Sequence, residues 1–260
     1  MKTILALTAA LLFSGYGTKA MAVQNKDVFA EDFNGQLSQF GLVLAKKRYA
    51  EVVRGQGLQG SKAMKVTYQG FEQGSYRVYA AAHLPEAALQ YQLSFAVKFC
   101  DNFDFVRGGK LHGLGPENPV TGGNKVTAEG WSARLMFEPD GGLRTYVYHQ
   151  DMKRKFGDSK TALNFRFVPG IYHQIQMLVR LNSATHLADG KVVVSVDGVE
   201  VIQHDKLRFR AKDTQASLIS KMLFITFHGG ATPDWAPRAA DGRYNKECAY
   251  FDNFVVSKVM

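Results

Sequence analysis

Cysteine is scarce in this sequence, with two residues in 260. That count excludes a disulfide-rich scaffold and a zinc site with four cysteine ligands. Acidic residues are also in deficit, since 23 Asp and Glu face 32 Lys and Arg and leave a formal net charge of +9. With 46% hydrophobic and 21% charged residues, the composition is that of a globular protein rather than a disordered polyelectrolyte. The positive surplus points to an anionic partner of unspecified kind.

Long apolar runs are missing beyond the start of the chain. Lys2, the apolar stretch 4–13 and the Ala-Met-Ala triplet that ends at Ala22 form the three-part pattern of a secretory signal peptide. We therefore predict a signal peptide over residues 1–22, removed after Ala22. No linker, repeat or low-complexity tract divides the remainder, which predicts a single domain over residues 23–260. The mature protein is expected to be secreted or periplasmic, with no membrane attachment after cleavage.

An exported protein can hold a disulfide between Cys100 and Cys248, because oxidising compartments permit one. The two cysteines lie near the ends of two predicted strands that are far apart in sequence. Their spacing does not decide between a disulfide and two reduced thiols, because a bridge depends on geometry. Neither cysteine has the sequence context of a catalytic nucleophile.

Alternating hydrophobicity dominates the rest of the chain and predicts short strands separated by polar or glycine-rich turns. The clearest case is residues 91–99, where every second residue is apolar. Further strands are predicted over residues 63–69, 75–81, 131–137, 143–150, 172–181, 191–196, 199–204, 221–228 and 249–259. Asp197-Gly198 indicates a tight type I′ hairpin turn, and residues 84–89 suggest one helical turn. The pattern favours an all-β fold, an antiparallel β-sandwich of jelly-roll type.

The two strands at 131–137 and 143–150 carry the most informative pattern. If both apolar faces are to enter the core, the five-residue turn 138–142 places Arg134 opposite Tyr146 and Ser132 opposite Tyr148. The solvent face of this hairpin then displays a hydroxyl, guanidinium groups and two phenols. An ordinary exposed sheet face, in which Tyr and Arg pair for stability, explains the same alternation.

Residues 107–115 combine basic side chains with four glycines directly after a predicted strand. We interpret this segment as a loop whose backbone approaches a ligand closely and directs Lys110 at it. The simpler alternative is a solvated basic loop. A phosphate-binding loop is excluded because the spacing of a Walker motif is missing.

These segments together resemble the signature blocks of polysaccharide lyase family 14. The resemblance spans roughly residues 95 to 256 and includes Phe224-Ile-Thr-Phe-His-Gly-Gly and Phe251-Asp-Asn-Phe. It implies a jelly-roll enzyme that cleaves alginate or glucuronan. The family's active-site positions correspond to a lysine, a serine, an arginine and two tyrosines: Lys110, Ser132, Arg134, Tyr146 and Tyr148. His112 stands where the family usually has proline, and His228 replaces an aromatic residue.

A lyase of this kind removes the C5 proton of a uronate and expels the C4 oxygen. Cations must neutralise the adjacent carboxylate, a base must take the proton, and an acid must protonate the leaving oxygen. Lys110 and Arg134 are candidates for holding the carboxylate or lowering a tyrosine pKa. Tyr146 or Tyr148 would serve as base and acid, with Ser132 orienting the sugar. Lys110 as the base is an open alternative. The surrounding substrate contacts are expected to be Arg107, His112, Arg144, Gln150 and His228.

Other functions are less compatible with the sequence. A glycoside hydrolase normally needs two opposed carboxylates, and the nearest acids, Glu129 and Glu138, lie at a strand entrance and in a turn. We expect no cofactor and no catalytic metal, since the histidines lack ligand spacing, and no nucleic-acid partner, since no binding motif is visible. The expected protein is a monomeric lyase for an anionic polysaccharide, alginate before glucuronan. A noncatalytic carbohydrate-binding module on the same fold is the alternative.

Overall fold

The computed structural model describes residues 25–259. The predicted signal peptide at 1–22 lies outside the described residues. Within them the regular secondary structure is mostly strand, and the helical segments are one short α-helix, α1 (Gln39–Ala45), and single 3₁₀ turns. No helix in this part of the chain is long and apolar enough to span a bilayer.

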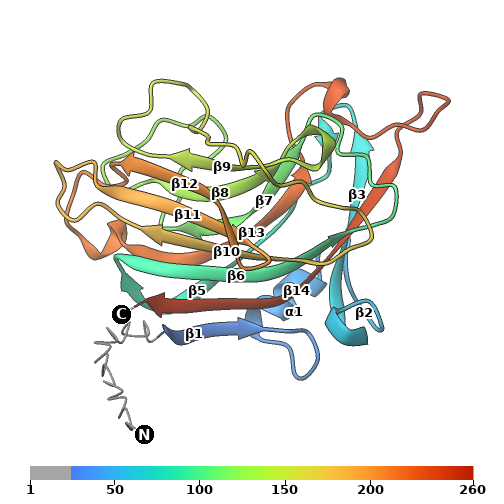
Figure 1. Ribbon diagram of the computed structural model, residues 1–260, viewed down its shortest axis with the longest axis horizontal. Coiled ribbons are helices and arrows are strands. Elements are labelled where there is room, and N and C mark those ends of the chain that lie inside the picture. Colours follow the sequence, from blue (N-terminus) through green and yellow to red (C-terminus); the bar gives the residue numbers. More distant parts are fainter. Residues whose placement is uncertain (1–24, 260) are drawn as a thin grey trace, which may run out of the picture.

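The described strands form two antiparallel sheets that pack face to face (Figure 1). The larger sheet has nine of them, in the order β12 (Val199–Leu207), β11 (Gly190–Val196), β10 (His173–Arg180), β6 (Gln90–Phe99), β14 (Lys246–Val259), β3 (Ala63–Phe71) and β2 (Ala50–Val53), with β1 (Asn25–Glu31) paired to β14 and β4 (Gly74–Ser75) to β3. The smaller sheet has five, in the order β5 (Val78–Ala88), β13 (Ile219–His228), β7 (Gly109–Gly115), β8 (Ser132–Phe137) and β9 (Leu143–Tyr148). This arrangement confirms the predicted all-β sandwich of jelly-roll type.

The core lies between the sheets and is rich in aromatic side chains. Strand β6 shows why, because its alternate residues from Tyr91 to Phe99 all point inward and are at most 1% exposed. Phe95, in the middle of this row, stacks on Phe254 with ring centroids 5.6 Å apart. The alternation read from the sequence therefore gave the correct inward face.

Two predicted segments differ from the structure. Residues 84–89 are not a helical turn, because residues 84–88 continue β5 and Ala88 pairs with Ile219. Residues 109–115 are not a loop but the central strand β7. The glycines there allow neighbouring strands to come close: a Cβ at Gly113 would lie 2.0 Å from the carbonyl oxygen of Ala133. Strands β1 and β2 and helix α1 were not predicted from the sequence.

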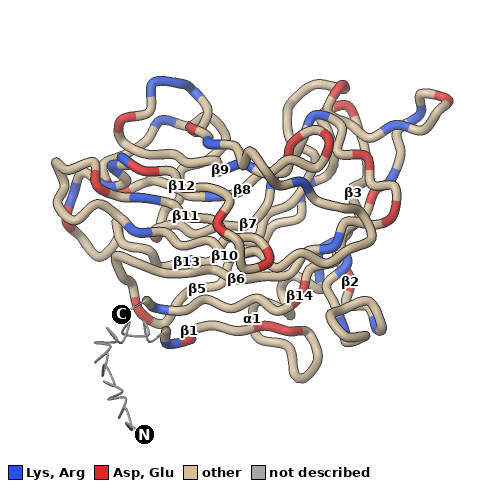
Figure 2. Tube along the Cα trace, in the orientation of Figure 1, with Lys and Arg blue, Asp and Glu red and all other residues tan. Residues whose placement is uncertain are grey.

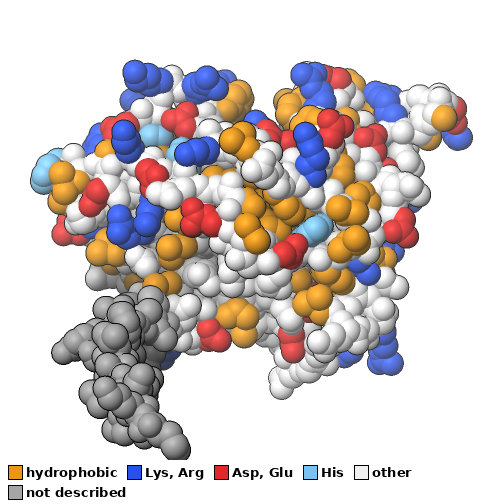
Figure 3. All heavy atoms as spheres, viewed as in Figure 1, with side chains coloured by type: hydrophobic (Ala, Val, Ile, Leu, Met, Phe, Trp, Pro, Cys, Tyr) orange, Lys and Arg blue, Asp and Glu red, His pale blue; other side chains and the backbone are white. Residues whose placement is uncertain are grey.

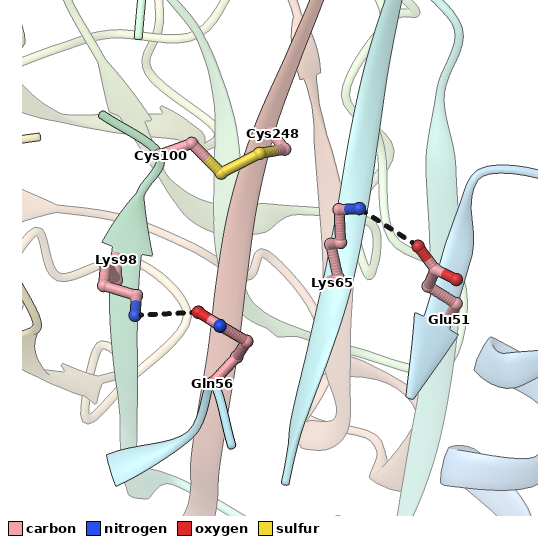
Figure 4. The surroundings of a disulfide bond; sticks show 6 residues. All are labelled: Glu51, Gln56, Lys65, Lys98, Cys100 and Cys248. Atoms are coloured by element: carbon pink, nitrogen blue, oxygen red, sulfur yellow. Dashed lines mark hydrogen bonds and ion pairs between the residues drawn. A yellow bond between two sulfur atoms is a disulfide. The ribbon is translucent and has the colours of Figure 1, made fainter. Parts of the chain in front are cut away.

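The structure confirms the predicted hairpin turn and decides the state of the two cysteines, which the sequence left open. Asp197 and Gly198 have φ angles of 51° and 82°, as a type I′ turn requires. The structure joins Cys100 to Cys248, with the two Cα atoms 5.4 Å apart (Figure 4). The bridge forms because β6 and β14 are neighbours whose ends meet, with Phe99 paired to Ala249.

Candidate active site

The β8–β9 hairpin has the register expected from its alternation. Arg134 pairs with Tyr146 and Ser132 pairs with Tyr148 across the two strands. The connecting turn takes five residues and is tight because Asp140 adopts a φ of 56°. The alternate residues of both strands enter the core, so the polar set is displayed on the outer face of the smaller sheet, which we call the site face.

Strand β7 brings a lysine onto the same face. Lys110 pairs with Met136 of β8, and its Nζ lies 2.9 Å from the Met136 sulfur and 3.4 Å from the centroid of the Tyr146 ring. The Arg134 guanidinium lies 5.4 Å from the Tyr146 ring centroid and 5.9 Å from that of Tyr148. Two cations and two phenols from three adjacent strands therefore converge on one spot.

The lysine is in a strongly perturbed environment. The pKa of Lys110 is lowered well below its ordinary value, first by burial and then by the positive charges of Arg134, Arg144 and Arg77. No carboxylate among residues 25–259 pairs with it to offset these effects. Lys110 is therefore suited to hold a neutral amine, which can accept a proton.

Arg134 is buried, with 3% exposure, and burial lowers its pKa, although guanidinium remains charged. Its Nε and Nη2 atoms have no hydrogen-bond partner in the described part of the chain. A buried cation with unused donors is costly unless a ligand completes it, and the fork of a guanidinium matches a carboxylate. The hydroxyl oxygens of Tyr146 and Tyr148 lie 3.3 Å apart and share a hydrogen bond.

The two phenols differ in their surroundings. Burial, reinforced by the hydrogen bond to Tyr148, raises the pKa of Tyr146, and the charge of Arg134 opposes this only in part. Tyr146 therefore retains its proton. The Tyr148 hydroxyl accepts a hydrogen bond from the backbone N–H of Gly123, at 2.8 Å. The pair can hold a proton close to the lysine and can deliver it.

The site face is covered rather than open to solvent, which corrects the sequence-based expectation. The segment 116–130, between β7 and β8, lies over it: Ser132 donates a hydrogen bond to the Val120 carbonyl, at 2.7 Å. Val120, Val126 and Met152 pack on the cluster of Met136, Tyr146 and Tyr148. Ser132 is fully buried beneath this cover, so its hydroxyl holds the segment in place in this conformation.

The two histidines expected to line a substrate groove lie in the core instead. His112 is fully buried, stacked on Phe224 with ring centroids 4.1 Å apart. His228 is also fully buried, stacks on Phe103, and shares a hydrogen bond with the Asp104 carbonyl. The prediction that they contact substrate is wrong, because both side chains point between the sheets and away from the site face.

The other three expected contacts are engaged with the protein. Arg107 is exposed and forms an ion pair with Asp234. Arg144 lies on the site face but pairs with Glu138, at 3.4 Å. Gln150 follows β9 and donates hydrogen bonds to two backbone carbonyls, which ties down neighbouring segments.

Met136 was not among the predicted site residues, although strand parity places it on the same face as Arg134, and it lies between the lysine and Arg144. Metal-binding geometry is absent from residues 25–259, where no three His, Cys, Asp or Glu side chains are grouped to hold an ion. His149 shares a hydrogen bond with Asp158, at 2.9 Å.

The space around the site is set by loops at one edge of the sandwich. Figure 3 shows a hollow at the upper edge, between two raised groups of side chains. In the charge-coloured trace, Lys and Arg lie on both sides of this hollow (Figure 2). Gly229, which follows β13, approaches the site from its other side: a Cβ there would lie 3.9 Å from the Lys110 side chain.

Fold and site together define a carbohydrate-active jelly roll with a cationic, phenol-bearing site. The family model for polysaccharide lyase 14 matches residues 56–254, and the chain belongs to that family. It is therefore a polysaccharide lyase by descent, and the resemblance seen in the sequence is confirmed. Comparison with curated proteins gave no match.

Solved structures with the same fold include three lyases. The chain resembles the PL-14 alginate lyase of Aplysia kurodai, with 22% identity, a TM-score of 0.68, and coverage of 89% of this chain and 98% of that one. Alginate lyase Aly36B is 21% identical, with a TM-score of 0.68 and coverage of 88% of this chain and 96% of that one. The endo-β-1,4-glucuronan lyase of Trichoderma reesei is 14% identical, with a TM-score of 0.61 and coverage of 90% of this chain and 96% of that one.

Proposed function

We propose that this chain is an exported lyase that cleaves an anionic polyuronate, alginate before glucuronan, by β-elimination. One observation carries the proposal: Lys110 and Arg134, neither paired with a carboxylate in the described chain, converge on the Tyr146–Tyr148 pair. Aly36B has been solved with an alginate tetrasaccharide, which supports alginate as the first substrate to test. The predicted signal peptide supports export.

In the proposed reaction, the unused donors of Arg134 bind the carboxylate of the sugar at the cleavage point. The Lys110 amine takes the C5 proton, electrons form the C4–C5 double bond, and the C4–O bond breaks. A phenol of the tyrosine pair gives its proton to the leaving oxygen. The lowered pKa of the lysine favours the neutral amine as base, and the raised pKa of Tyr146 favours a protonated phenol as acid.

A hydrolytic reaction finds less support in the same residues. Hydrolysis requires two carboxylates on opposite sides of the bond. Of the two acids nearest the hairpin, Glu138 pairs with Arg144 and Glu129 accepts a hydrogen bond from Thr214. Neither carboxylate lies among the groups that converge on the site face.

The test is incubation of the purified protein with alginate, polymannuronate, polyguluronate and polyglucuronate. Elimination creates an unsaturated sugar at each new end, which absorbs ultraviolet light and is one water lighter in mass than a hydrolysis product. We expect such products from at least one polymer. Binding without any unsaturated ends, over a range of pH and salt, would instead establish the noncatalytic binding module.

A further inference from the structure

A row of side chains crosses the smaller sheet on the site face. Lys110 pairs with Met136 on one side, and Met136 pairs with Arg144 at the edge strand β9. On the other side Lys110 pairs with Phe227 of β13. Arg77, directly before β5, continues the row, since its guanidinium lies over the Phe227 ring, 5.0 Å from the centroid. Cationic and apolar side chains thus alternate from one edge of the sheet to the other.

The cations of this face differ in whether an acid neutralises them. Arg144 pairs with Glu138, and Lys221 of β13 pairs with Glu117 at 3.0 Å. Arg77 is exposed, and no carboxylate or hydrogen-bond acceptor in residues 25–259 engages its guanidinium. Its charge is close enough to the lysine to contribute to the lowering of that pKa. Arg77 is therefore a free cation on the same surface as the site, at the opposite edge from the tyrosines.

An exposed aromatic ring stands beside this arginine. Tyr79 is the second residue of β5 and is 62% exposed, whereas its neighbours Val78 and Ala80 belong to the core. Strand parity puts Tyr79 on the same face as Arg77. Lys47, which follows α1, lies 4.7 Å from the centroid of the Tyr79 ring and adds positive charge. An exposed ring next to unpaired cations is an arrangement suited to an acidic sugar.

We propose that Arg77 and Tyr79 form an edge subsite that binds a uronate residue of the substrate at a distance from the cleaved linkage. Arg77 holds the carboxylate and Tyr79 contacts the sugar ring. This subsite rests on the proposed function of the main site and extends it. Strands β5 and β7 are separated by two strand spacings, about 10 Å, so the subsite lies at that distance from Lys110 across the sheet. A polymer that crosses the strands from the tyrosines to β5 would occupy both, so short oligosaccharides would miss the second.

Arg77→Gln tests this proposal, because it removes the charge from an exposed side chain and leaves the core untouched. We expect KM for polymeric substrate to rise about tenfold, as loss of one charge-assisted hydrogen bond predicts. At a pH where Lys110 is neutral in both proteins, kcat should stay within about twofold, since the interaction of Arg77 with the substrate is made equally before and during the reaction. Arg77→Lys should restore part of the loss. Tyr79→Ser should raise KM in the same direction.

Arg180→Gln is the matched control, since Arg180 is exposed at the end of β10 in the other sheet and carries the same charge. Its KM should match that of the unaltered protein, which separates the subsite from a general loss of positive charge. Substrate length provides a second readout. The unaltered protein should prefer long oligosaccharides to the shortest cleavable one, and Arg77→Gln should lose most of that preference. An unchanged KM together with an unchanged length preference would overturn the edge subsite while leaving the lyase activity standing.

Calorimetric titration keeps the two proposals separable. If no polyuronate yields unsaturated ends, the proposed lyase activity fails, and the edge subsite is then judged by binding of long alginate oligosaccharides. An affinity about tenfold weaker for Arg77→Gln than for Arg180→Gln supports the subsite. Equal affinities, or no binding by either variant, refute it.

Discussion

Both faces of the smaller sheet bury polar side chains, yet these side chains differ in kind. On the inner face His112 and His228 are uncharged rings stacked on phenylalanines, and burial lowers their pKa values to about 3 and about 4. On the site face Lys110 and Arg134 are basic groups, and both lack an acidic partner in the described chain.

This difference shows how a buried site can be told from a core. A histidine escapes the cost of burial by losing its proton, so its presence inside requires no ligand. An arginine cannot avoid the cost of burial in this way, because its guanidinium does not lose its proton. A lysine crowded by other cations avoids that cost only by losing its proton, which leaves a neutral amine that can act as a base. Buried cations without carboxylates therefore indicate a surface built for an anion that is absent from the free protein.

The largest expected effect comes from removing the lysine of the site. Lys110→Met should reduce turnover roughly a thousandfold or more, because the base is lost. The free energy of unfolding should not fall, because the substitution removes a buried polar amine that has no acidic partner in the described chain. Lys221→Met is the control: it removes a lysine from the neighbouring strand, but one that is paired with Glu117, and it should leave turnover nearly intact. Activity is measured by release of unsaturated ends and stability by denaturant unfolding.

Equal loss of activity in both lysine variants would contradict the assignment of Lys110, because it would show that the site face responds to charge in general. A large loss of stability in Lys110→Met would show instead that the lysine is structural.

The inner face should respond in the opposite way. Phe95→Ala should cost about 3 to 5 kcal/mol of unfolding free energy, since it opens a cavity in a ring cluster that is fully buried. The turnover number of the fraction that remains folded should be unchanged. Leu163→Ala, at a side chain that is 91% exposed, serves as the control and should be neutral. Chemical denaturation measures both, and a Phe95→Ala protein as stable as the control would mean that the packing described for β6 is wrong.

Most of the fold and the polar set of the site could be predicted because strand parity is a local property. In β8 and β9 the alternation fixes which residues share a face, and the odd length of the turn fixes Arg134 against Tyr146. The same argument gave the inward face of β6. No catalytic role follows from parity, so the roles of the five site residues remain proposals.

The misplaced residues show where local reasoning fails. Simple alternation would put Lys110 and His112 on one face, but the pairing of β7 with β8 shifts register between Lys110 and Gly113, which turns the histidine into the core. Four glycines also made this strand look like a loop. The cover over Tyr148 depends on a contact with Gly123, far from it in sequence, and no periodicity encodes such a contact.

The smallest expected effect is a change in how the unfolding free energy depends on pH, and it arises from His112 on the inner face. The pKa of His112 is about 3 in the folded chain against an ordinary 6.5, so between these values the unfolded chain binds more protons. Its contribution to stability is complete above pH 6.5 and is lost as the pH falls toward 3. His112→Asn keeps a side-chain oxygen that can accept a hydrogen bond from the Ile225 N–H, but asparagine cannot titrate. The unfolding free energy of this variant should therefore fall less steeply with decreasing pH than that of the unaltered protein, and the two slopes should differ by up to about 1.4 kcal/mol per pH unit. His186→Asn, at an exposed histidine, is the control, and denaturant unfolding at pH 4 to 7 is the measurement. A slope for His112→Asn as steep as that of the control would mean that His112 takes up its proton as readily in the folded chain as in the unfolded one, so the inner face would hold a buried charge at acidic pH.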